Sequence, residues 1–154
     1  MASLLTASSL GGVQVQMLLA DSAQVADGKL FILGGGWSLI GPDPTPTAVA
    51  VKLTIDRHEV GRSHHWYLVL EDADGRPVYV GDTMQAIEVN GEFQIGQPVG
   101  VPDGVPVDFP MAINFPPLPI APGARYQWRL IINGETLPGA SVAFSTRPQP
   151  DVDA

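Results

Sequence analysis

Several residue types that support specific chemistry are absent or scarce in this chain of 154 residues. There is no cysteine, which excludes a disulfide framework, a thiolate metal site and a cysteine nucleophile. Eight lysines and arginines stand against sixteen acidic residues, for a net charge of −8. Without a basic stripe to neutralise phosphates, neither nucleic acid nor an anionic membrane surface is an expected partner.

Long apolar runs are also missing. No stretch approaches the roughly 18 consecutive apolar residues of a membrane span. The first ten residues carry no lysine or arginine, unlike a secretory signal peptide. We therefore expect a soluble, cytoplasmic protein.

Glycine and proline are abundant instead, with 17 and 15 copies, and 45% of the residues are hydrophobic. This composition indicates many tight turns, and hence short strands rather than long helices. The length is sufficient for one domain with a real hydrophobic core. We predict a single domain over residues 1–146 and a loose tail over residues 147–154.

Alternation of apolar and polar residues predicts strands that bury one face. The clearest alternation covers residues 47–56. Residues 29–33 are apolar on both faces, so we expect a central strand or one that is covered on both sides. Further strands are predicted over residues 13–19, 64–71, 78–80, 85–89, 92–95, 109–115, 125–132 and around 142–144.

Turn signals separate these strands. Asp27-Gly28, Asn90-Gly91 and Asn133-Gly134 are typical of tight hairpins. Residues 96–108 contain three prolines and three glycines, which predicts a long surface loop. About nine strands and no convincing helix favour a sandwich or a barrel.

The sequence around Tyr126 narrows this choice. The Pro122-Gly123 turn delivers Tyr126 to the start of an alternating strand, the pattern of a tyrosine corner. We expect the Tyr126 ring to be buried and its hydroxyl to return to the backbone of the corner. Trp66 and Trp128 are in phase with aliphatic residues, so we assign both to the core. Together these features predict an all-β, immunoglobulin-like antiparallel β-sandwich.

Two resemblances accompany this pattern. Residues 118–146 resemble the final third of a fibronectin type III domain, which implies the fold and no function. The front of the chain is similar to the start of a bacterial, largely actinobacterial, family known only as a domain of unknown function. That second resemblance implies no activity, and it rests on Met17–Asp21, Ala23–Val25, Asp27–Leu30 and Leu33–Trp37.

His58, His64 and His65, with Asp56 and Glu59 nearby, suggest a metal site at first sight. Neighbours in a strand point to opposite faces, so His64 and His65 cannot both bind one ion without distortion. We interpret these histidines as ordinary surface or strand-end residues and predict no metal ligand.

The Gly34-Gly35-Gly36 run has the composition of a phosphate-binding loop, which requires a helix after the glycines. Here Trp37 leads into a proline-rich loop, so a sharp bend with close packing is favoured. The chain also lacks a Gly-x-Ser-x-Gly elbow. Glu71, Asp72 and Asp74 surround a turn, where aspartate is common for turn chemistry alone. We therefore predict no catalytic residue, no cofactor and no enzymatic activity.

The remaining hypothesis is a non-catalytic module that binds protein or assembles with itself. Open sandwiches have edge strands that must be covered, so a homo-oligomer is the expected form. Trp37 is the candidate contact residue, provided that it is exposed beside the loop at residues 41–46. The alternative is a small-molecule or carbohydrate binder with weak hydrolase activity. Its candidate site is the strand face that carries His65, Tyr67 and Glu71.

Overall fold

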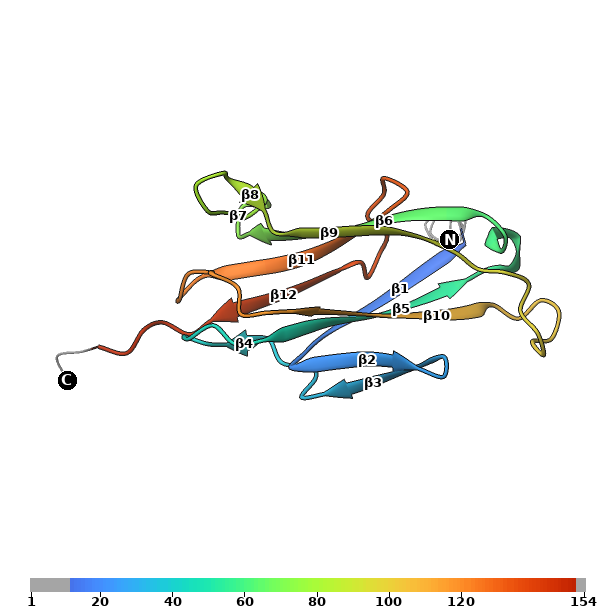
Figure 1. Cartoon of the computed structure of the whole chain (residues 1–154), viewed down its shortest axis with the longest axis horizontal. Helices are drawn as coiled ribbons and strands as arrows, with labels where there is room; N and C mark the ends of the chain where they lie inside the picture. Colours follow the sequence, from blue (N-terminus) through green and yellow to red (C-terminus); the bar gives the residue numbers. More distant parts are fainter. Residues whose placement is uncertain (1–11, 152–154) are drawn as a thin grey trace, which may run out of the picture.

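The computed structural model describes residues 12–151 of the chain, and the structural statements below concern these residues. They form a nearly all-β structure of mainly antiparallel sheets that pack together, which confirms the predicted β-sandwich. Figure 1 shows three levels: a five-stranded sheet, a three-stranded sheet, and a two-stranded ribbon beyond it.

The three-stranded sheet has the order β1-β5-β10, formed by β1 (Val13–Ala20), β5 (Thr47–Ile55) and β10 (Val107–Phe115). The facing sheet has the order β4-β12-β11-β6-β9. Its strands are β4 (Leu39–Ile40), β12 (Ser141–Thr146), β11 (Arg125–Ile132), β6 (Ser63–Asp72) and β9 (Glu88–Gln94). Within residues 12–151, only β4 pairs in parallel, with β12.

Three small elements lie outside these sheets. β2 (Ser22–Ala26) and β3 (Lys29–Leu33) form the ribbon, and β7 (Tyr79–Val80) pairs with β8 (Gln85–Ala86). A single 3-10 turn, η1 (Arg57–Glu59), follows β5. The described residues form more strands than the sequence predicts. The difference includes very short strands, since β4, β7 and β8 have only two residues each.

The core lies between the two sheets, and β5 shows why the alternating pattern was informative. Val49, Val51, Leu53 and Ile55 are buried and belong to the main core cluster. The opposite face of β5 carries Ala48 and Ala50, which are equally buried, but in a second cluster with Ala20 and Ala23. Their small side chains allow the ribbon to pack closely over the three-stranded sheet.

The tyrosine corner has the geometry expected from its sequence. Gly123 has a φ of +67°, and the Tyr126 hydroxyl accepts a hydrogen bond from the backbone N–H of Ala121 at 2.9 Å. Trp128, which is buried, stacks on Phe115 of the opposite sheet with ring centroids 4.5 Å apart. These two contacts fix the corner and join the layers.

Two predicted strand features are wrong. Asn90-Gly91 does not form a turn, because β9 runs straight through it, with Gly91 opposite Trp66. The half-buried Trp66 indole lies over this glycine: a Cβ at Gly91 would be 2.9 Å from Trp66 Nε1. Gly91 is therefore required here because it leaves space for the Trp66 ring. The second error concerns β3, which is neither central nor covered on both sides.

Other turn predictions are confirmed. Asp27 and Gly28 both have positive φ and join β2 to β3, and Asn133-Gly134 follows β11 with the same signs. The chain from Ile95 to Pro106 contains no strand, as expected for a surface loop. β12 ends at Thr146, and Arg147 still hydrogen-bonds to the backbone of Ile40 and Gly123.

Candidate protein-contact surface

The β2–β3 ribbon is closed by a two-residue turn. Asp27 and Gly28 have φ values of 53° and 71°, the left-handed pair that a type I′ hairpin requires. The register pairs Ala26 with Lys29, and the remaining residues follow in strict order to Ser22 and Leu33. Alternate residues of this ribbon therefore face the sandwich or solvent.

One face of the ribbon covers the three-stranded sheet. Ala23 is buried there and Leu30 is half-buried, both against the alanine cluster of β5. The Asn114 side chain of β10 joins the ribbon to the sheet: its Oδ1 accepts from the Ala23 N–H at 3.2 Å, and its Nδ2 donates to the Ala23 carbonyl at 2.8 Å. The Asn114 amide thus makes the two hydrogen bonds at Ala23 that a neighbouring strand would otherwise make.

The other face of the ribbon, which carries Lys29, Phe31 and Leu33 on β3, is open to solvent. Phe31 is 49% exposed and Leu33 is 70% exposed, although both are large hydrophobic residues. Three further side chains leave more than a third of their surface open: Val25 and Ile32, which lie on the same face as Ala23 and Leu30, and Leu18 of β1. We call these five residues the ribbon patch: Leu18, Val25, Phe31, Ile32 and Leu33.

The patch continues from the ribbon onto β1 through the glycine run. A Cβ at Gly35 would lie 2.7 Å from Ile32 Cγ2 and 3.2 Å from Leu18 Cδ2. Gly35 therefore lets the chain turn closely under both side chains, which agrees with the favoured interpretation of the run as a tightly packed bend. An apolar surface that extends over several elements marks an interaction site more often than scattered exposed residues do.

The backbone of β3 is open as well. In a two-residue hairpin the residues that flank the turn exchange hydrogen bonds, and every second pair does so thereafter. Lys29 and Phe31 therefore bond to β2, whereas the N–H and C=O groups of Leu30 and Ile32 point away from it. Among residues 12–151, no third strand pairs with β3.

Charge is low around the ribbon patch. Residues 13–40 contain two aspartates and one lysine, so this segment contributes −1 to the net charge of −8. The self-repulsion expected of an acidic protein is consequently concentrated elsewhere on the molecule.

Trp37, the contact residue proposed from the sequence, lies apart from this surface. It is half-buried and meets the Phe144 ring edge-on, with centroids 5.9 Å apart. Its Nε1 is buried and lacks a hydrogen-bond partner among the described residues. The role of Trp37 in a protein contact stays a prediction.

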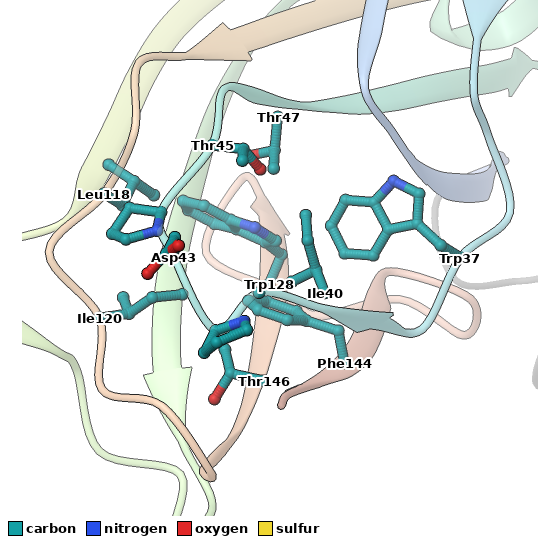
Figure 2. Close-up of a pocket in the computed structure, with 13 residues that line it drawn as sticks. Trp37, Ile40, Asp43, Thr45, Thr47, Leu118, Ile120, Trp128, Phe144 and Thr146 are labelled. Carbon is teal, nitrogen blue, oxygen red and sulfur yellow. The ribbon is translucent and has the colours of Figure 1, made fainter. Parts of the chain in front are cut away.

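Trp37 also lines an apolar cavity beneath the loop at residues 41–46. Figure 2 shows Trp37 and Leu118 on opposite sides, with Ile40 and Trp128 between them. The cavity volume is about 30 Å³, which is enough for one or two water molecules. Sites for small organic ligands are about tenfold larger.

The histidines are separated as strand geometry requires. His64 is buried and stacks on Phe93, whereas His65 is exposed on the other face. The Asn133 amide donates to His64 Nδ1 at 2.9 Å, which leaves the proton on Nε2, 3.3 Å from the Glu59 carbonyl. The described part of the chain contains no group of three His, Asp or Glu residues that could hold a metal ion.

The carboxylate of the alternative ligand site is already engaged. Glu71 is buried and accepts hydrogen bonds from Arg129 Nη2 at 2.7 Å, Arg129 Nε at 3.0 Å and Gln127 Nε2 at 2.8 Å. Burial raises the pKa of Glu71, but the hydrogen bonds from Arg129 and Gln127 together with the Arg129 charge outweigh it, so the pKa lies below its ordinary value. Glu71 therefore stays ionised and bound to Arg129, while His65 and Tyr67 remain on that face without it.

The loop between β9 and β10 is held by Arg57, a residue that no sequence pattern singled out. Arg57 donates from Nε to the Val105 carbonyl at 2.9 Å, and from Nη2 to the carbonyls of Val101 at 2.8 Å and Pro102 at 2.7 Å. Val99, at the free side of this loop, is 98% exposed. The loop is a smaller apolar surface, separate in sequence from the ribbon.

Fold and surface together define a class: a β-sandwich protein with an apolar ribbon whose outer strand edge is open. The chain belongs to the family of unknown function DUF6941, whose model matches residues 16–144 and so includes both the ribbon and the tyrosine corner. No curated protein and no solved structure matches the chain. Within residues 12–151, no helix is long and apolar enough to cross a membrane.

Proposed function

We propose that this protein is a non-catalytic binding module that contacts another protein chain through the ribbon patch. The observation that carries the proposal is the state of β3. It combines the exposed side chains of Phe31 and Leu33 with the outward backbone groups of Leu30 and Ile32. Burial of the side chains would supply affinity, and hydrogen bonds to the backbone groups would fix the orientation of a partner strand along β3.

An uncovered β3 leaves part of the stabilisation that its apolar side chains could supply unused. Full burial of a phenylalanine or leucine side chain is worth about 1.5–3 kcal/mol, and much of that gain is not realised at Phe31 and Leu33. Natural proteins blunt exposed edges with lysine, proline or bulges. The β3 edge has only Lys29 for this purpose. A covered edge is therefore the state in which this sequence is most stable.

A ligand-binding role has weaker support. The cavity beside Trp37 is too small for an organic ligand, and the Glu71 carboxylate is neutralised by Arg129. The binding-module proposal also includes a setting: the resemblance of the front of the chain to an actinobacterial family supports a role in a bacterium, and the cytoplasmic location expected from the sequence stays a prediction. The likeness of residues 118–146 to a fibronectin type III domain supports a sandwich that serves as a scaffold.

Site-specific photo-crosslinking tests the contact surface. A photoreactive phenylalanine analogue is placed at Phe31 in the full chain and irradiated in cells that naturally produce the protein. The matched control carries the analogue at Met84, which is 64% exposed on the β7–β8 turn. We expect a discrete protein adduct from position 31 and none from position 84. Absence of any adduct from position 31, including one with a second copy, would refute the proposal.

A further inference from the structure

We infer that the occupant of the β3 edge is β3 of a second copy, paired antiparallel about a two-fold axis that passes beside Phe31. The inference rests on the proposed function, since it names the partner of the same surface. The resulting ribbon has four strands in the order β2-β3-β3-β2. Each sandwich lies next to its own β2, at the outer end of this order.

The hydrogen-bonding pattern of β3 fits this pairing. Leu30 and Ile32 direct their N–H and C=O groups outward, and they are two residues apart. In an antiparallel pair centred on Phe31, Leu30 lies opposite the partner's Ile32, and Ile32 lies opposite the partner's Leu30. All eight outward groups of the two copies are then satisfied in two closely spaced pairs. Other registers centred on Leu30 or Ile32 leave part of this edge unpaired.

The side chains fit the same register. Phe31 faces the partner's Phe31 at a non-hydrogen-bonded position, where opposing Cα atoms are about 4.5 Å apart and side chains meet most closely. The open face of the ribbon then carries an unbroken apolar row of Phe31 and Leu33 from both copies. Lys29 lies opposite the partner's Leu33, and its methylene stem can cover that side chain while the ammonium stays in water.

The area at the paired edge sets the strength of this contact. The five side chains of the ribbon patch expose on the order of 400 Å² in one copy, the size of a patch that is often functional. Val25 lies on β2 and Leu18 on β1, away from the paired edge, and the open face of the ribbon stays in solvent. The pairing therefore buries less than the roughly 1,200 Å² of stable interfaces, which places it among weak contacts that depend on concentration. Residues 13–40 carry a charge of −1, whereas residues 71–108 carry −7, from eight acidic residues and one arginine, so most of the repelling charge lies in another segment.

The structure also explains why such pairing would end at two copies. The other edge of the ribbon is blocked at Ala23 by the Asn114 amide, so a third chain cannot add to β2. In Figure 1, β3 lies at the lower edge of the molecule, beyond the three-stranded sheet, and presents its outer side to solvent. A two-fold contact of this kind is closed, whereas a contact between different edges would continue into a fibre.

Disulfide trapping tests the register. The natural chain has no cysteine, and the Cα separation at a non-hydrogen-bonded pair is within the range that a disulfide spans. Under mild oxidation at micromolar concentration, we expect Phe31→Cys to form a covalent dimer at least about tenfold faster than the exposed control Met84→Cys. Equal rates for the two variants would overturn the inference.

Charge complementation tests the two-fold symmetry without covalent trapping. Sedimentation equilibrium should show the natural chain as a dimer of its 16.3 kDa unit. Phe31→Lys and Phe31→Glu should each be monomeric at the same concentration, because like charges then face each other. An equimolar mixture of the two variants should restore a dimer.

These results separate the two proposals. If the natural chain is monomeric but position 31 cross-links to a different protein, the second-copy inference fails and the binding-module proposal stands. If the chain is monomeric and position 31 yields no adduct, both fail. If the mixture of charged variants does not associate while the natural chain dimerises, another surface is responsible and the β3 pairing is wrong.

Discussion

At the scale of single residues, the five-stranded sheet is stabilised by a charge that it buries. Glu71 is 2% exposed and is held ionised by Arg129 and Gln127 on the neighbouring strand. Its pKa is below the ordinary 4.5, so the folded state binds this proton more weakly than the unfolded state does. The stabilisation is therefore complete above pH 4.5 and is lost as pH falls through the lowered pKa.

Replacement of Glu71 tests this linkage. We expect Glu71→Gln to lower the free energy of unfolding by about 1–3 kcal/mol at pH 7, because charge-assisted hydrogen bonds are lost. The difference from the natural chain should shrink below pH 4.5, and urea unfolding at pH 7 and pH 3 measures it. The control Glu88→Gln changes an exposed carboxylate and should have little effect at either pH. A difference for Glu71→Gln that grows on acidification would contradict the assignment.

Gly91 is a second position where one residue decides the local packing. A Cβ there would lie 2.9 Å from Trp66 Nε1 and 3.0 Å from Trp66 Cε2. We expect Gly91→Ala to cost about 1–3 kcal/mol, as for other overpacked sites, and to alter Trp66 fluorescence. The control Gly96→Ala has no atom within 4 Å of its new Cβ and should be nearly neutral. Similar stabilities for the two variants would show that the indole moves freely.

At the scale of elements, the ribbon depends on one side chain of the sheet below it. Asn114 supplies both hydrogen bonds that hold the outer edge of β2. Its replacement leaves the Ala23 N–H and C=O without partners in a half-buried place, which costs more than the loss of an exposed contact. The ribbon and the sandwich are thus coupled at a defined point.

The variant Asn114→Ala should therefore loosen the ribbon more than the sandwich. We expect the Ala23 amide to lose hydrogen-exchange protection by about tenfold or more, consistent with a local cost of about 1–3 kcal/mol. Amides of β11 should change far less. Asn90→Ala, an exposed residue of β9, is the control. Unchanged protection at Ala23 would mean that the alanine cluster alone holds the ribbon.

The elements also show where the sequence was informative. The strand β5 was predicted correctly because its bulky apolar side chains alternate with smaller or polar ones, but the burial of Ala48 and Ala50 on its second face was not predicted. Asn90-Gly91 was mistaken for a turn because local turn chemistry cannot reveal a tryptophan on the neighbouring strand. The strand at residues 29–33 was predicted to be internal because its composition is that of a core strand. Its surroundings, set by the Asp27-Gly28 turn and by Asn114, are what leave it exposed.

At the scale of the whole molecule, the sandwich could be predicted and the exposed apolar ribbon, our proposed contact surface, could not. Periodicity and the tyrosine corner indicate which side chains are buried within one chain. The two packed sheets bury these side chains. A surface that is buried only on association has the same composition as a core, so the pattern alone cannot separate the two. Trp37 was chosen for its uncertain phase, whereas the most exposed apolar ribbon residues, Phe31 and Leu33, were hidden within an apparently ordinary strand.

Hydrogen exchange at β3, followed as a function of protein concentration, tests the central claim most directly. If the edge pairs with a second copy, the amides of Leu30 and Ile32 should be protected at high concentration and should exchange quickly on dilution. The amide of Phe31 bonds to β2 within the same chain, so its protection should change much less and serves as the internal control. Rapid exchange of Leu30 and Ile32 at every concentration would contradict the account.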